Sequence, residues 1–233
     1  LNSMRLLARN KIDFRRQRVG IAPTTHFFLG GLVVNNRSET SLPGLFAAGE
    51  VTGGFHGANR LGGNALTECI VCGVVAGAGA AEYAKTEGKI SFATSRAEAL
   101  LPLWANEKGN KVRQEYRELF DKIKKTAWEQ AGVIRNSEGL QKGLALLSQM
   151  EGDLRVLTPI GVSEGLRHNQ IRSALLVLRC ILESSLRREE SRGAFFREDY
   201  PEIDDANWRR HIRISLDGSK ERLVLEETSL IGS

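Results

Sequence analysis

The chain has 233 residues, of which 41% are hydrophobic, and a net charge of +5 from 33 basic and 28 acidic residues. This length and composition allow one large or two modest domains with real cores, and exclude a disordered chain, a collagen-like repeat and a disulfide scaffold. Because the charges of both signs are interleaved, the positive excess does not by itself indicate nucleic-acid binding, and no such partner is predicted. Three cysteines, an odd number, are typical of a reducing compartment.

The first third of the chain is predicted to contain short strands, a glycine-rich loop and one helix. Residues 1–17 are basic and are expected to form a helix end or connector. Three runs rich in apolar or β-branched residues predict short strands, the last of them buried. An apolar helical pattern then predicts a buried helix. The three strand runs are residues 19–23, 31–35 and 45–49, and the helix covers residues 64–84.

The predicted helix has two features that invite other interpretations. Its apolar stretch is about 16 residues long and includes Glu68, short of the ~20 residues that cross a bilayer, so no membrane span is predicted. Cys69 and Cys72 have the spacing of a metal or redox pair. Since the sequence shows no second cysteine pair and no nearby histidine pair, we predict core packing for both and no metal site.

The rest of the chain predicts a helical bundle followed by a hairpin. Apolar residues recur at helical spacing along three amphipathic stretches, and Asn136 is placed to cap the second of them. Because three such helices must cover each other's apolar faces, we expect a bundle. Alternation on both sides of residues 217–220 predicts the hairpin. The three apolar sets are Val112, Tyr116, Leu119, Ile123 and Ala127; Leu140, Leu144 and Leu147; and Ile171, Leu175, Leu178 and Leu182.

Half of the 24 glycines lie between Gly30 and Gly79, and the loop over residues 50–63 is rich in them. Glycine permits positive φ and a close approach of the backbone to a ligand, and the following helix start presents free N–H groups suited to an anion. Arg60 stands just before that helix and could grip a carboxylate with two hydrogen bonds. These features predict an anion-binding strand–loop–helix unit, but neither a P-loop nor the usual dinucleotide fingerprint is present.

Several motifs, in order, resemble the flavoprotein subunit family of succinate dehydrogenase and fumarate reductase. Residues 23–31 (PTTHFFLGG), 44–50 (GLFAAGE) and 56–66 (HGANRLGGNAL) resemble its flavin-binding part. Residues 132–136 (GVIRN) and 190–194 (ESRGA) resemble its C-terminal part, and the resemblance covers about residues 18–215. The chain departs from the family's common pattern at Phe27–Leu29, where Tyr and Met are usual, at Ala65, where a hydroxyl residue is usual, and at Phe195, where His is usual.

The resemblance implies a fold and roles for individual residues. The fold would be α+β: the C-terminal piece of an FAD-binding α/β domain over residues 1–86, a helical domain over 87–205 and a hairpin tail over 206–233. His26 and Arg60 would bind a dicarboxylate, succinate or fumarate, and hydride would move between it and FAD. The FAD-binding residues would be Gly30, Glu50, Asn64, Ala65 and Leu66.

The resemblance also implies what this chain lacks. The family's N-terminal dinucleotide fingerprint and its capping domain, which supplies the arginine that acts as proton donor, are not found in the sequence. We therefore expect a C-terminal portion of a longer protein, with no catalytic proton donor and no activity by itself. An iron–sulfur subunit is the expected partner, and the expected location is cytoplasmic, with peripheral attachment to the inner membrane through partner subunits.

Two other functions fit the same residues. L-aspartate oxidase has a similar HGANR-type loop, although residues 197–208 resemble succinate dehydrogenase and fumarate reductase more closely. The basic helical part could alternatively be a docking module for an iron–sulfur subunit, without chemistry of its own. For individual residues, His56 could contact the flavin or have a structural role, and the segment from Arg187 to Gly193 is interpreted as a structural clasp between the bundle and the flavin-binding part.

Overall fold

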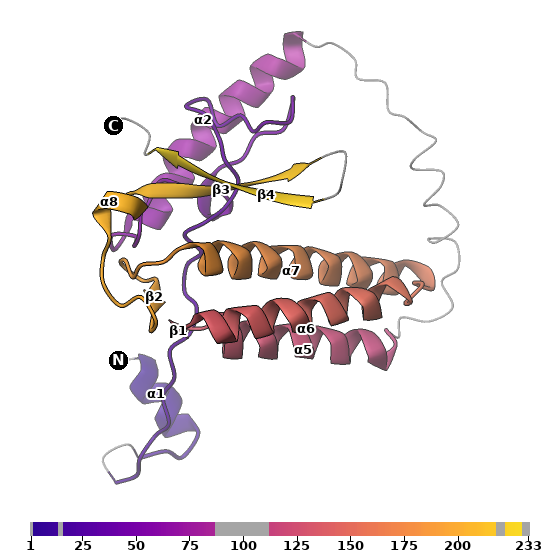
Figure 1. The fold of residues 1–233 in the computed structure, drawn as a ribbon. Coiled ribbons are helices and arrows are strands. Elements are labelled where there is room, and N and C mark those ends of the chain that lie inside the picture. The colour runs from indigo at the N-terminus through magenta and orange to yellow at the C-terminus, as the bar shows by residue number, and fades with distance from the viewer. Residues whose placement is uncertain (1, 14–15, 87–111, 218–221, 230–233) are drawn as a thin grey trace.

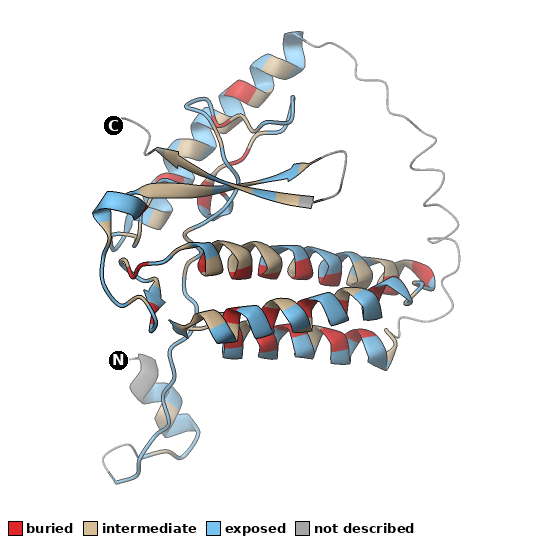
Figure 2. Cartoon of the chain, in the orientation of Figure 1, coloured by how far each residue is buried: buried red, intermediate tan, exposed pale blue. Residues whose placement is uncertain are grey.

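Three long helices, α5 (Gln114–Ala131), α6 (Ser137–Arg155) and α7 (Gly161–Arg187), form the predicted bundle in the computed structural model (Figure 1). The structure describes residues 2–13, 16–86, 112–217 and 222–229. Eleven buried apolar side chains form the bundle core, and they lie on the facing sides of the helices (Figure 2). Apolar positions at helical spacing thus form a shared core, as predicted. These side chains are Tyr116, Leu119, Ile123, Leu140, Leu147, Met150, Leu154, Ile171, Leu175, Leu178 and Leu182.

The turn between α5 and α6 is defined by a cap and a short strand pair. The Asn136 side chain accepts a hydrogen bond from the Gly139 N–H, confirming it as the N-cap of α6. Just before it, β1 (Ile134–Arg135) pairs in parallel with β2 (Phe196–Arg197), with Ile134 opposite Phe196. The segment that follows α7 is therefore joined to the start of α6.

Buried Arg197 ties this end of the bundle together. Its Nη1 donates to the carbonyl oxygens of Ser185 and Arg188 at the end of α7, at 2.6 and 2.9 Å. Its Nε and Nη2 donate to the Asp199 carboxylate at 2.8 Å, and Nη2 also reaches the Ser137 hydroxyl at the start of α6. One guanidinium thus satisfies carbonyl groups that a helix end leaves unpaired and bridges two helices.

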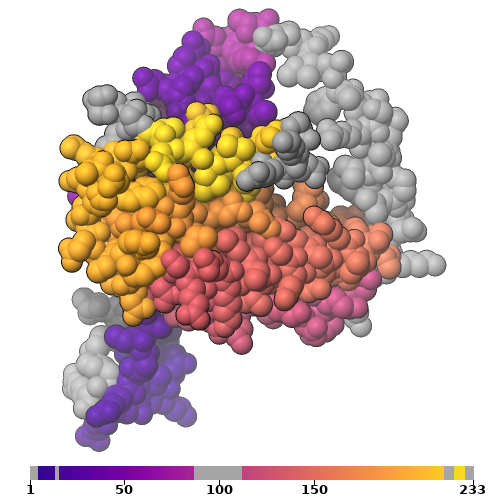
Figure 3. All heavy atoms as spheres, viewed as in Figure 1, coloured from indigo at the N-terminus to yellow at the C-terminus, as the bar shows by residue number. Residues whose placement is uncertain are grey.

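The C-terminal hairpin is confirmed. Strand β3 (Arg210–Asp217) pairs antiparallel with β4 (Arg222–Ser229), and the short helix α8 (Asp205–Trp208) precedes it. The hairpin runs along the side of α7 that faces away from α5 and α6 (Figures 1 and 3). An ion pair of 2.8 Å between Arg187 and Glu227 joins it to α7, while the predicted turn at residues 218–220 lies outside the described residues.

The predicted strands in the first third of the chain were wrong. Among the described residues, residues 19–23 form no strand, and Ile21 is 95% exposed. The other two runs make isolated bridges, between Leu32 and Thr52 and between Glu39 and Phe46. A β-branched run becomes a strand only where a neighbouring segment pairs with it over several residues, and in the described residues the pairing of these two runs does not extend beyond a single bridge. Residues 49–51 instead form the 3₁₀ turn η1 (Gly49–Val51).

Helix α1 (Asn2–Arg9) agrees with the predicted helix end and projects away from the other helices (Figure 1). Helix α2 (Asn64–Thr86) confirms the predicted position of the second helix but not its burial, since only Glu68 and Gly79 on it are buried. Cys69 is exposed and Cys72 partly so, against the prediction of core packing. Both corrections have one cause: little of the described chain packs against α2 (Figure 2).

The length of α2 agrees with the predicted helix over residues 64–84. Its 23 residues make it the one helix of the described residues that is long and apolar enough to cross a membrane. Length and composition of this kind are weak evidence, because core helices of soluble proteins meet the same criterion. The absence of a membrane span therefore stays a prediction, as do the three domain boundaries.

Candidate functional site

The segment that carries His26 is held by the glycine-rich region. His26 itself is exposed, and two residues later the Phe28 N–H donates to Glu50 Oε1 at 2.8 Å. Beyond Gly30, the Leu32 N–H donates to the Val51 carbonyl oxygen at 2.8 Å. Gly31 allows this approach, because a Cβ there would collide with the Val51 carbonyl group. Predicted residues His26, Gly30 and Glu50 are thus brought into one small region.

Arg60 belongs to the same region through an aromatic ring. Its guanidinium carbon lies 4.6 Å from the centroid of the Phe27 ring, in cation–π geometry. Nη1 donates to the Leu61 carbonyl oxygen at 3.1 Å, whereas Nε is buried without a hydrogen-bond partner in the part of the chain that is described. A buried guanidinium N–H without a partner is costly, and it is the signature of a missing acceptor.

Behind Phe27 lies a buried pair of His56 and Glu68. His56 Nε2 is 3.0 Å from Glu68 Oε2, and the two side chains are only 8% and 6% exposed. The Thr52 hydroxyl lies 2.9 Å from the other Glu68 oxygen and 2.7 Å from the Gly49 carbonyl oxygen. The His56 ring meets the Phe27 ring edge-on, with the centroids 5.3 Å apart. The pair therefore fixes the loop to α2 and supports Phe27.

The start of α2 is accessible, and its first three residues are not hydrogen-bonded to the His26 segment in the described part of the chain. Asn64 and Leu66 are exposed and Ala65 is partly so. Gly62 and Gly63 immediately before the helix face open space, so that a ligand could approach their backbone closely. Among the described residues, no hydrogen bond links these three predicted cofactor residues to His26 or Arg60.

The C-terminal part contacts the glycine-rich loop through residues 190–194. The Ala194 N–H donates to the Ala58 carbonyl oxygen at 3.1 Å. Gly193 has φ of +59°, and a Cβ there would collide with the Ala58 backbone, so glycine is required at this contact. This contact supports the interpretation of the segment as a structural clasp.

Buried Glu190 organises this clasp. It accepts hydrogen bonds from Arg188, Arg192 and the Asp204 N–H, at 2.6 to 3.0 Å. Burial alone would raise the pKa of Glu190, but the hydrogen bonds from Arg192, Asp204 and Arg188 outweigh it and lower that pKa below its usual value. Hydrogen bonds to Glu190, and then to Asp205, raise the pKa of Arg192 further above its ordinary value. The clasp is therefore an ionised network across the working pH range.

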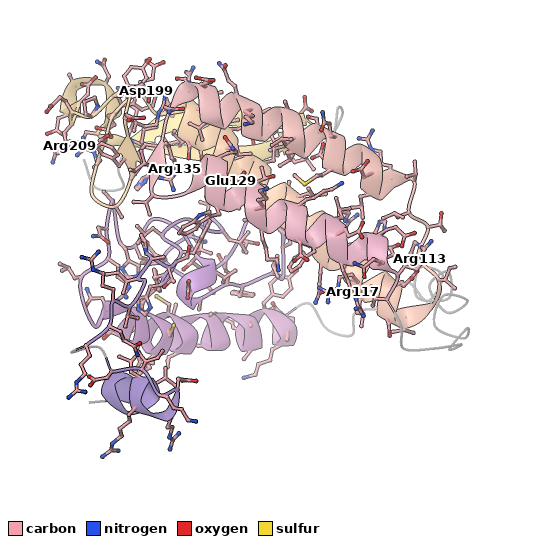
Figure 4. All side chains as sticks on the ribbon, turned by 90° about the horizontal axis from the view of Figure 1, so that it is seen from below. Arg113, Arg117, Glu129, Arg135, Asp199 and Arg209 are labelled. Atoms are coloured by element: carbon pink, nitrogen blue, oxygen red, sulfur yellow. The ribbon has the colours of Figure 1, made fainter. Side chains whose placement is uncertain are left out.

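A cleft of about 1020 Å³ separates the His26 segment from the bundle and the clasp. Six lysine and arginine residues and two histidines line it, and none of the described lining residues is acidic. Among them, Arg135 stacks on Phe195 at 5.1 Å and has its pKa lowered by burial. Two of the lining arginines, Arg135 and Arg209, lie at one end of the bundle (Figure 4). Arg113 and Arg117, which do not line the cleft, lie at the other end. The charge of the cleft favours anionic ligands.

Sequence reasoning missed three parts of this region. Phe27 stands out in the sequence only as a departure from a familiar pattern, although its ring contacts both His56 and Arg60. In the sequence, Glu68 is only a charged residue within an apolar helix. A charged residue at such a position is the signal that could have indicated a buried partner. The contact of Gly193 with Ala58 has no signal in the sequence beyond the glycine itself.

Comparison with known proteins identifies the family. The profile described as "Fumarate reductase flavoprotein C-term" matches residues 120–231, and the profile described as "FAD binding domain" matches residues 5–66. The two matches, in this order and on this fold, define a segment of a flavoprotein whose relatives are FAD-dependent oxidoreductases. The chain belongs to the fumarate reductase and succinate dehydrogenase flavoprotein family.

Individual relatives match most of this chain but a minor part of their own length. An uncharacterized FAD-dependent oxidoreductase of Methanocaldococcus jannaschii is 37% identical over 87% of this chain and 37% of its own. The fumarate reductase flavoprotein subunit of Haemophilus influenzae is 34% identical over 83% of this chain and 34% of its own length. An L-aspartate oxidase of Pyrococcus furiosus is 34% identical over 84% of this chain and 34% of its own length. The chain thus spans little more than a third of the length of these curated relatives.

A solved structure agrees with the fold. The Sdh1 complex of Mycobacterium smegmatis, in its apo form, contains a chain that superposes with a TM-score of 0.82 and 31% identity, over 98% of this chain and 40% of that one. Both the glycine-rich region and the bundle therefore fall within a fold that is known in this family.

Proposed function

We propose that this chain is part of an FAD-dependent oxidoreductase that interconverts succinate and fumarate by hydride transfer between the flavin and the dicarboxylate. The observation that carries the proposal is the state of Arg60. Its guanidinium is stacked on Phe27, next to His26 in the sequence, and its buried Nε has no partner among the described residues. A carboxylate is the acceptor that matches a guanidinium best, because it can accept two parallel hydrogen bonds.

Arg60 and His26 are the proposed dicarboxylate ligands. Arg60 supplies a permanent positive charge and directional donors, whereas His26 is exposed and can donate a further hydrogen bond. The cationic lining of the cleft beside His26 attracts a dianion from solution. Neither residue is proposed as the proton donor, which we expect from a capping domain outside this chain.

The residues around the start of α2 fit the flavin part of FAD. Gly62 and Gly63 leave open space beside the backbone, Leu66 is 70% exposed, and a helix start stabilises negative charge on a bound group. We propose that Gly30, Glu50, Asn64, Ala65 and Leu66 hold FAD in the complete protein. When bound, FAD supplies the ring that gives or takes the hydride.

The wider assignments follow from the same proposal. We propose that this chain is a C-terminal portion of a longer flavoprotein and that its complete form associates with an iron–sulfur subunit. It would then be cytoplasmic and attached at the inner membrane through partners. The relatives named as a chain of an Sdh1 complex and as a fumarate reductase flavoprotein subunit support a multi-subunit protein.

The experiment is a titration of the isotope-labelled chain with fumarate and with succinate, followed by NMR. We expect saturable shifts of the His26 and Arg60 side-chain signals in the unmodified chain. Arg60→Gln should lose the shift of His26, and both shifts should persist in the control Arg37→Gln, whose arginine is exposed and paired with Glu82. Absence of the shifts in the unmodified chain would contradict the dicarboxylate site and leave the docking-module alternative. We also expect the chain alone to bind FAD poorly and not to turn over, which stoichiometric flavin in the purified chain would disprove.

An L-aspartate oxidase activity of the complete protein is the second candidate. It is favoured by the 34% identity with the P. furiosus L-aspartate oxidase. The two functions differ in whether the site accepts an ammonium group beside a carboxylate. Tighter binding of L-aspartate than of succinate in the same titration would favour the oxidase.

A further inference from the structure

We propose that Glu68 and His56 form a positioning pair that sets the orientation of Arg60 through the Phe27 ring. The inference rests on the proposed function in one respect, that Arg60 binds a carboxylate. In addition to holding the loop in place, Glu68, His56 and Phe27 would orient the Arg60 side chain. None of the three is proposed to touch the reacting atoms, so they are positioning residues.

The pair has the properties of a rigid anchor. Both side chains are almost fully buried, and their 3.0 Å contact joins the loop to the second turn of α2. The contact between His56 Nε2 and Glu68 Oε2 fixes the plane of the imidazole ring. The Thr52 hydroxyl, 2.9 Å away, orients the Glu68 carboxylate in turn. The imidazole therefore presents a defined face to its surroundings.

The orientation passes from His56 to Phe27 by ring contact. The two rings meet at an interplanar angle of 74° with centroids 5.3 Å apart, an edge-to-face arrangement that aromatic pairs prefer. The backbone beside Phe27 is fixed separately, because the Phe28 N–H is bonded to Glu50. With its backbone and one side of its ring held, Phe27 has little freedom to turn.

Arg60 depends on that ring. The Phe27 ring lies 4.6 Å from its guanidinium carbon, and within the described ranges the group makes one hydrogen bond, from Nη1 to the carbonyl oxygen of its neighbour Leu61. A long arginine side chain otherwise loses considerable rotamer freedom when it binds a ligand. A ring that already holds the guanidinium plane reduces this loss and keeps the unpaired Nε aimed in one direction.

The test separates positioning from simple stabilisation by observing Arg60 directly. In the full 233-residue chain, the Nε–H resonance of Arg60 reports the Phe27 ring above it, and a fumarate titration reports binding. We expect Glu68→Gln and Phe27→Leu to shift this resonance and to raise the fumarate dissociation constant about tenfold, which corresponds to about 1.4 kcal/mol. Phe27→Tyr, which keeps the ring, is expected to restore what Phe27→Leu loses.

The matched control is Glu164→Gln. Glu164 is also a buried carboxylate paired with a basic side chain, Arg113, but it lies in the bundle. We expect this variant to lower stability while leaving the Arg60 resonance and the dissociation constant unchanged. An unshifted Arg60 resonance in folded Glu68→Gln, with His56 ring signals moved, would overturn the proposal. If Glu68→Gln fails to fold, an unshifted resonance in Phe27→Leu overturns it equally.

Failure of the proposed function gives a different result. If the unmodified chain does not bind fumarate, the dicarboxylate site is wrong, but the Arg60 resonance still shows whether the pair orients the guanidinium. If fumarate binds and the variants bind it equally well, the site stands and the positioning pair is wrong.

Discussion

The bundle and the glycine-rich region are stabilised in opposite ways. Residues 114–187 share a core of eleven buried apolar side chains. Of the described residues 16–86, Ala47 is the one buried hydrophobic residue, while Ser38, Thr52 and Glu68 are buried polar groups. The bundle is therefore held by apolar burial, and the glycine-rich region by hydrogen bonds, ring contacts and close backbone approach.

This difference separates stability from the proposed chemistry. A region with few buried apolar contacts opens locally at low free energy, and binding loops are drawn from such regions. Eleven of the thirteen buried hydrophobic residues of the described chain lie in the bundle, and the residues proposed to bind ligands lie in the region with few buried apolar contacts. Substitutions in one region should therefore leave the other unchanged, and four of them test this, from the largest expected effect to the smallest.

Arg197→Met is expected to have the largest effect. It leaves the Asp199 carboxylate and the carbonyl groups at the end of α7 without their buried donor, and should lower the free energy of unfolding by about 4 kcal/mol. Chemical denaturation followed by circular dichroism measures this change. The control Arg187→Met removes an exposed ion pair with Glu227 and should cost less than about 1 kcal/mol. Equal effects of the two variants would contradict the prediction.

Leu147→Ala should destabilise the bundle by about 3 kcal/mol, because it leaves a cavity at a fully buried position. Hydrogen exchange read by mass spectrometry should show faster exchange in α5, α6 and α7 and unchanged exchange over residues 26–66. The matched control is Leu166→Ala, where the leucine is 62% exposed and little change is expected. Faster exchange in both regions would show that they unfold as one unit.

Gly193→Ala should break the contact between the two regions and cost about 2 kcal/mol. Alanine is strained at a φ of +59°, and its Cβ would collide with the Ala58 backbone. The measurement is faster exchange of the Ala194 amide, which is bonded to Ala58. Gly165→Ala in α7 faces open space and should be neutral or stabilising by about 0.5 kcal/mol.

Asp199→Asn should have the smallest effect and a distinct pH dependence. Hydrogen bonds from Arg197, and then from Ser137, hold the pKa of Asp199 well below its usual value. A carboxyl whose folded pKa is depressed adds stability above its unfolded pKa of about 3.9 and loses it as pH falls through the folded pKa. We expect a loss of about 1 kcal/mol at about pH 7 that vanishes at low pH, measured by urea denaturation.

The control for this prediction is Asp153→Asn. Its ion pair with Lys122 is exposed and 3.8 Å long, so little change is expected at any pH. A constant difference between Asp199→Asn and the unmodified chain from neutral down to low pH would contradict the assigned cause.

Sequence patterns predicted the bundle well because each helix makes its backbone hydrogen bonds within itself and the three helices bury one another's apolar faces. Leu140, Leu147 and Leu182 could be placed in the core from spacing alone, and Asn136 as a cap from its position. The short strands at residues 19–23 and 45–49 failed because a strand depends on a partner that its own sequence does not specify. The prediction that α2 is buried failed for a related reason, because few of the described residues pack against its apolar side chains.

The candidate site was predictable in part. His26, Glu50 and Arg60 lie on or beside one segment, which agrees with their prediction as a group, while their roles stay predictions. The support behind them could not be predicted, because an edge-to-face ring contact or a buried His–Glu pair arises from tertiary placement. Residues 64–66 stay predictions in the same sense, at an accessible helix start without described contacts to the others.

The two-residue pairing of β1 with β2 also constrains the order in which the chain folds. Ile134 and Phe196 are partners although far apart in sequence, and most of the intervening chain is α6 and α7. Closing so long a loop for so few hydrogen bonds is unfavourable until those helices have docked and shortened the span. The pair should therefore form late, after α6 and α7 have docked on each other.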